Sequence, residues 1–122
     1  MDREVVHPAD AKSGAVFERF RADGRAYFVK RTSPERDWIM RVTGDRDFRT
    51  HRIWRAGILH RAAAVVEHAI VDVTVEGGEL VVLMRDVGDA LVPPGDGIVP
   101  QEQHRALLTG LAGLSALFAG WR

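Results

Sequence analysis

One lysine, Lys30, closes a short apolar run, Arg25–Arg31, with the sequence RAYFVKR. The three residues before it, Tyr27 to Val29, are typical of a strand that packs against a core. A lysine in such a place is costly unless its ammonium reaches water or an anion. Lys30 is therefore either an ordinary solvated lysine, the commoner case, or a fixed counter-charge for an anionic ligand.

Two β-hairpins are predicted, one of which carries Lys30. Asp23-Gly24 and Gly77-Gly78 are each flanked by β-prone runs, and such two-residue turns are the strongest local hairpin signal. The run before Asp23 alternates, with Phe17, Arg19 and Arg21 on one face. The expected strands are Val5–His7, Ala15–Arg21, Arg25–Arg31, Ala69–Val75 and Glu79–Met84. The last of these lacks polar residues, so it should be central and covered on both faces.

Two helices are expected between the hairpins. Ser33 and Pro34 suit a helix start, which would turn Trp38, Ile39 and Val42 toward the core. A second helix is expected from about residue 45 to residue 60. Its inward face would hold Thr50, Ile53, Trp54, Gly57 and Ile58.

A last helix is predicted from Pro100 to Ala119. Its apolar stripe consists of Leu107, Leu108, Leu111, Leu114, Leu117 and Phe118. Gly110 and Gly113 would let a neighbouring element approach closely.

Composition excludes several classes of function. The chain has 122 residues, enough for one domain, and its 17 basic residues balance 17 acidic ones, so no global field favours nucleic acid or membrane. It has no cysteine, and its histidines lack metal-site spacing. No apolar run is long enough to span a bilayer and no signal peptide is evident. A soluble cytoplasmic protein is expected.

The order of these elements, with a lysine closing the third strand and a helix following, resembles the N-terminal lobe of protein-kinase-like folds. The closer similarity is to aminoglycoside phosphotransferase-like kinases, over residues 12–122 and less than half of such an enzyme. The segments that carry it are Lys12–Ala15 as the nucleotide loop, Tyr27–Lys30 as the third strand, Ile53–Leu59 on the long helix, Val82–Val87 as the fifth strand and hinge, and His104–Trp121 as the helix toward a C-terminal lobe.

This resemblance implies a site for ATP. Lys30 would contact the α- and β-phosphates as a positioned counter-charge, and backbone N–H groups of the nucleotide loop would lie over the phosphates. Backbone groups of the hinge would receive the adenine edge, between apolar side chains. The implied binding residues are Ser13, Gly14, Ala15, Val16, Phe28, Lys30, Met84, Arg85, Asp86 and Val87.

The chain departs from the family in two places. Thr50 occupies the helix position where a glutamate should pair with the strand lysine, and Asp47 would replace it only with a shifted register. The family's catalytic and metal-binding residues belong to its C-terminal lobe, and this sequence contains no His-x-Asp motif. We therefore expect no catalytic residue here, weak ATP binding, and a Mg²⁺ site only where such a lobe is supplied.

The domain organisation follows from the resemblance. Residues 1–88 would form a kinase-like lobe, 89–99 a hinge loop, and 100–122 a helix leading toward a C-terminal lobe, all within one α+β unit. The last helix would then have lost its cover, so we expect it to pair with a second copy as a homodimer.

Three functions remain open at this point. The first is the nucleotide-binding lobe of a small-molecule phosphotransferase, inactive on its own. The second is a non-catalytic interaction or regulatory protein with the same fold. The third is a ligand-binding α+β domain unrelated to kinases.

Overall fold

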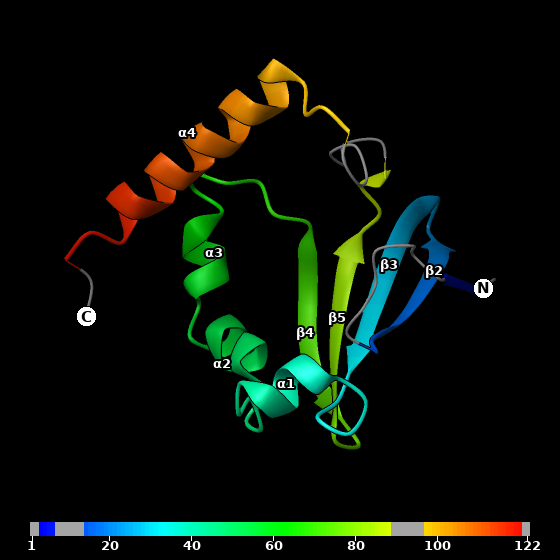
Figure 1. Ribbon diagram of the computed structural model, residues 1–122. Coiled ribbons are helices and arrows are strands. Elements are labelled where there is room, and N and C mark those ends of the chain that lie inside the picture. Colours follow the sequence, from blue (N-terminus) through cyan, green and yellow to red (C-terminus); the bar gives the residue numbers. More distant parts are fainter. Residues whose placement is uncertain (1–2, 7–13, 89–96, 121–122) are drawn as a thin grey trace.

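The protein has an α+β fold built on one five-stranded antiparallel sheet (Figure 1). The computed structural model describes residues 3–6, 14–88 and 97–120. The strands are β1 (Arg3–Val6), β2 (Val16–Ala22), β3 (Arg25–Thr32), β4 (Ile70–Glu76) and β5 (Glu79–Arg85), and the helices are α1 (Trp38–Val42), α2 (Arg49–Arg55), α3 (Ile58–Ala62) and α4 (Gln101–Leu117). The predicted fold class, an antiparallel sheet with helices and a long last helix, is confirmed.

Two tight turns set the sheet's hairpins. Asp23 and Gly24 both have positive φ, as do Gly77 and Gly78, which is the backbone of the primed turns that match the strand twist. The strand order is β1-β2-β3-β5-β4, so β3 and β5 are interior strands. The central place predicted for the all-apolar strand is therefore correct.

The register decides which side chains share a face, because directly paired residues of an antiparallel ladder point to the same side. Lys30 pairs with Val82, and Val82 pairs with Val73. Val73 and Val82 are buried, with Phe48 and Trp54 packed against them. We call this side the core face, and Lys30 lies on it.

The opposite face of the sheet is more polar near β1 and β2. There the Glu18 carboxylate joins two arginines, with one oxygen 3.5 Å from Arg3 Nη1 and the other 3.2 Å from Arg31 Nε. This face also buries Val29, beside the directly paired Leu83.

Helix α1 begins later than predicted. Ser33–Arg36 forms a turn, and Asp37 caps the helix by accepting hydrogen bonds from the backbone N–H groups of Ile39 and Met40. The later start rotates the helix, so Met40 is buried at 6% exposure while Val42 is 76% exposed. The prediction that Trp38, Ile39 and Val42 face inward is wrong, because the cap is Asp37 and not Ser33.

The predicted second helix is two helices. Gly57 has φ +76, a left-handed conformation that ends α2 and starts α3. Trp54 packs on the core as predicted, whereas Ile53 is exposed.

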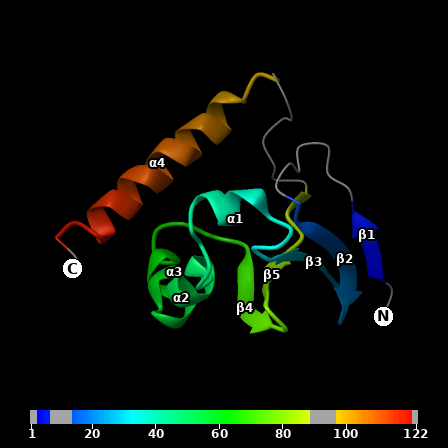
Figure 2. The ribbon, with the colours of Figure 1, turned by 60° about the horizontal axis from the view of Figure 1, so that its bottom comes forward.

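Helix α4 lies apart from the sheet, on the side of α3 (Figures 1 and 2). Gly110 and Gly113 face Val66 and Val65 of the same chain, so the close approach they allow is intramolecular. Near the end of the helix, Arg61 donates to the carbonyl of Leu117 at 3.3 Å, and its guanidinium lies over the Phe118 ring at 5.4 Å. Within the part of the chain that is described, no helix has the length and apolarity to cross a membrane.

We predict a homodimer through α4, and the exposed side chains of the structure show which leucines would form its interface. Leu107, Leu108 and Leu111 are each more than half exposed, whereas Leu114 and Leu117 are half-buried. Three such leucines expose roughly 300 Å², about the size of the largest apolar patch on a typical monomer, which is often functional. Light scattering at micromolar concentration should report a dimer, and Leu108→Asp with Leu111→Asp should shift it to monomer. A monomeric wild-type protein would contradict this prediction.

Candidate functional site

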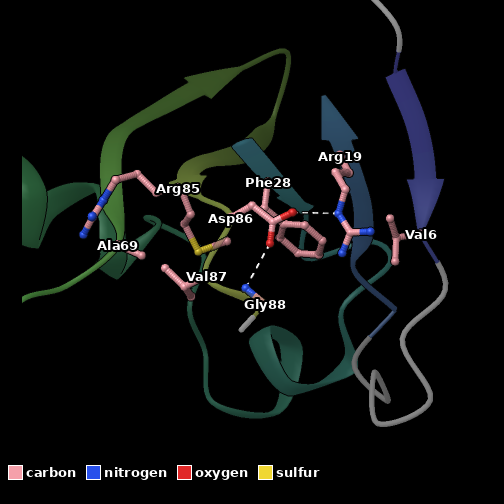
Figure 3. Close-up of a pocket in the computed structure, with 9 residues that line it drawn as sticks. Val6, Arg19, Phe28, Ala69, Arg85, Asp86, Val87 and Gly88 are labelled. Atoms are coloured by element: carbon pink, nitrogen blue, oxygen red, sulfur yellow. Dashed lines mark hydrogen bonds and ion pairs between the residues drawn. The ribbon is translucent and has the colours of Figure 1, made fainter. Parts of the chain in front are cut away.

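A cavity of about 340 Å³ opens on the core face, where β5 ends (Figure 3). Side chains from three adjacent strands form its wall: Arg19 pairs with Phe28 across β2 and β3, and Phe28 with Met84 across β3 and β5. The connector Asp86–Gly88 forms its rim, and Val6, Ala69 and Arg85 complete the lining. The size falls at the lower end of the range for small-molecule sites, about 300–1,000 Å³.

Lys30 lies on the same face as this cavity, two residues beyond Phe28. Two residues of strand correspond to about 7 Å between Cα atoms. Lys30 is half-buried, and no ion pair or hydrogen bond joins its ammonium to another residue in the described part of the chain. A cation in this position is available to a ligand that occupies the cavity and extends along the strand.

One backbone hydrogen bond ties the connector to the sheet, from the N–H of Asp86 to Ala26 O at 3.0 Å. Just before the connector, the N–H of Arg85 in β5 donates to Ala69 O at 2.8 Å. The N–H of Gly88 donates to Asp86 Oδ1 at 3.1 Å. The N–H of Val87 donates to no other residue in the described part of the chain. Val87 is therefore the connector residue best placed to bind the polar edge of a ligand.

The sequence analysis missed Arg19, which lines the cavity. Its Nε lies 2.8 Å from Asp86 Oδ2, so one ion pair joins β2 to the connector (Figure 3). The alternation of β2 had placed Arg19 on the face of Phe17, which is also the face of Lys30. The alternation of β2 therefore indicated the face on which Arg19 lies. Its partner Asp86 follows β5, and the proximity of β5 to β2 depends on the strand order of the sheet.

Five of the implied binding residues line the cavity: Phe28, Met84, Arg85, Asp86 and Val87. Lys30 is not among the lining residues. Figure 3 shows the Arg85 side chain directed away from the cavity, where it contacts Glu67 Oε1 at 3.4 Å and the carbonyl of His68 at 3.1 Å.

Of the residues implied for the nucleotide loop, the structure describes Gly14 and Ala15, and neither lines the cavity. Lys12 and Ser13 lie outside the described residues. Ala15 is half-buried at the start of β2 and is not part of the cavity lining. Val16 pairs with Arg31, which puts it on the opposite face of the sheet from Phe28.

Gly14 has a structural reason to be glycine. Its φ is +86, and a Cβ at this position would overlap the carbonyl oxygen of Arg36. The backbone at Gly14 therefore approaches the turn before α1 closely. This contact joins the start of β2 to the chain that follows β3.

No acidic partner for Lys30 is seen in the described ranges. Thr50 lies half-buried in the first turn of α2, and Asp47 is exposed. Within those ranges, no group of three or more histidines and acidic residues is arranged to hold a metal ion.

No protein-family model matches this chain, and neither a curated protein nor a solved structure matches it significantly. The functional argument therefore rests on the residues and geometry of this molecule.

We predict that Gly14→Ala lowers the free energy of unfolding by about 3–5 kcal/mol, because the new Cβ adds a backbone clash to the strain of a positive φ. Gly44→Ala is the matched control. Gly44 has φ +69 but nothing within 4 Å of a built Cβ, so only the backbone strain of about 1–2 kcal/mol applies. Urea denaturation measures both, and equal losses in the two variants would show that the Arg36 contact is unimportant.

Proposed function

We propose that this chain binds a nucleotide at the cavity beside Lys30, as the nucleotide-binding lobe of a small-molecule phosphotransferase resembling aminoglycoside phosphotransferase-like kinases. The observation that carries the proposal is the shared face. Lys30, Phe28 and Met84 all belong to the core face, and the connector closes one end of the cavity. An apolar cavity that could hold a base thus lies two residues along β3 from a lysine suited to binding phosphates.

ATP fits this arrangement in one orientation. The base would enter between Phe28 and Met84, with its polar edge against the Val87 backbone. The phosphates would then extend along β3 toward Lys30, whose compact ammonium offers three hydrogen-bond donors. Because such a cavity buries only part of the ligand, we expect a dissociation constant on the order of 0.1–10 mM.

The element order supports the same proposal. Three strands precede the short helices, two strands follow them, and a connector then leads to a long helix. This is the order on which the resemblance was based. Phosphoryl transfer also needs a positioned base and Mg²⁺ ligands, and the proposal for this chain is limited to binding.

A second candidate is a non-catalytic interaction or regulatory protein with this fold. The described part of the chain places no carboxylate within ion-pair distance of Lys30. A kinase lysine is normally held by a helix glutamate. Thr50 offers no such charge, which favours a binding role over a catalytic one.

We predict that ATP titration shifts backbone amide resonances near Lys30 and at Met84–Val87. Lys30→Met should weaken ATP binding about tenfold or more, since it removes the only cation on that part of the core face that has no described partner. Arg25→Met is the matched control, because Arg25 lies on the same strand but on the opposite face. The absence of shifts at these sites with saturating millimolar ATP would refute the proposed function.

We also predict that the purified chain transfers no phosphate from ATP to any acceptor. The sequence has no His-x-Asp motif, and the general base and metal ligands each contribute orders of magnitude to such a reaction. Radiolabelled ATP with a panel of hydroxyl acceptors is the measurement. Reproducible transfer that disappears in Lys30→Met would show that the catalytic groups are within this chain.

A further inference from the structure

Arg19 lies beside the space that a base would occupy. The nucleotide contacts proposed above involve Lys30 and the connector and leave Arg19 without a role. It is directly paired with Phe28 across β2 and β3, so the two side chains are neighbours on the core face. Both line the cavity, whose other side chains are mostly apolar. The Arg19 side chain is 46% exposed, so one part of it contacts the cavity wall and the guanidinium remains accessible to a ligand.

The partner of Arg19 fixes the orientation of its guanidinium. Arg19 Nε lies 2.8 Å from Asp86 Oδ2, an ion pair that holds the guanidinium toward the connector. Asp86 is itself held, because its other oxygen accepts from Gly88 N–H. Its side chain is 17% exposed, against 46% for Arg19. In the described part of the chain no aromatic ring lies over this guanidinium, so a planar ligand can approach it from the cavity.

No further hydrogen bond or ion pair of Arg19 with a described residue is seen at Nη1 or Nη2. In Figure 3 Arg19 and Phe28 lie next to each other, and Asp86 reaches across from the connector to Arg19. The cation is thus held at the cavity wall before any ligand arrives. Such preorganisation lowers the entropy cost of binding.

Resting on the proposed nucleotide binding, we propose that Arg19 is a base-recognition residue whose guanidinium stacks on the purine ring, with Asp86 as the residue that positions it. A planar, weakly hydrated guanidinium stacks well on aromatic faces, whereas a lysine ammonium does not present a plane. A purine offers a larger π-face than a pyrimidine, so the contact favours purine nucleosides.

The test is an NMR titration of the full chain with adenosine, cytidine and ATP. In the wild-type protein, adenosine should move the Arg19 Nε–H resonance upfield by its ring current, and more than cytidine does. Arg19→Lys should weaken adenosine binding about 3- to 30-fold, the usual range for a cation–π contact. ATP binding should weaken by the same factor, because the lost contact is to the base.

Two variants serve as comparisons. Arg21→Lys changes an arginine on the same strand that donates to Gly24 O and lies outside the cavity, so it should leave adenosine binding unchanged. Asp86→Asn keeps an acceptor for Gly88 but removes the charge that holds Arg19. It should weaken adenosine binding although Arg19 is still present.

The possible failures are distinguishable. If the wild-type protein binds adenosine and Arg19→Lys binds it equally well, the role of Arg19 is refuted and the proposed function stands. A loss of ATP binding without a loss of adenosine binding would also refute stacking, because Arg19 would then contact phosphates. If neither ligand shifts any resonance of the wild-type protein, both proposals are refuted.

Discussion

The pairing of β3 with β5 is the contact on which both the fold and the candidate site depend. Its register places Lys30 beside Val82, which belongs to the buried core, and Phe28 beside Met84, which lines the cavity. A shift of β3 by one residue would turn Phe28 and Lys30 to the other face, away from Val82 and Met84. Hydrophobic burial of Val82 therefore also fixes the direction of the Lys30 ammonium.

Local sequence was sufficient for the sheet but not for the helices. Asp23-Gly24 and Gly77-Gly78 define hairpins because few residues tolerate positive φ at both turn positions. Helix boundaries depend on competition between neighbouring caps. Asp37, and not Ser33, is the N-cap of α1, because its carboxylate accepts hydrogen bonds from two backbone N–H groups. Gly57 looked like part of a continuous apolar face, yet its left-handed backbone divides the helix.

Only those parts of the candidate site that lie on a predicted strand, or directly after one, could be predicted from the sequence. Lys30, Phe28 and the connector lie on or next to predicted strands, so their relation could be anticipated. The pairing of Arg19 with Asp86 joins residues 67 positions apart, and nothing in either local pattern specifies it. The close contact of Gly14 with Arg36 is likewise a property of the assembled chain, since it depends on how the turn after β3 folds back.

The hydrogen bond from the N–H of Asp86 to the carbonyl of Ala26 continues the β3–β5 ladder past the end of β5. The connector is therefore part of the sheet's cooperative unit, while α4 is held through α3 and its neighbouring valines. Local opening in proteins follows such differences in attachment. We therefore expect α4 to separate at a lower free energy than Asp86, which is hydrogen-bonded to a central strand. A partner that displaces α4 would thus leave the cavity intact.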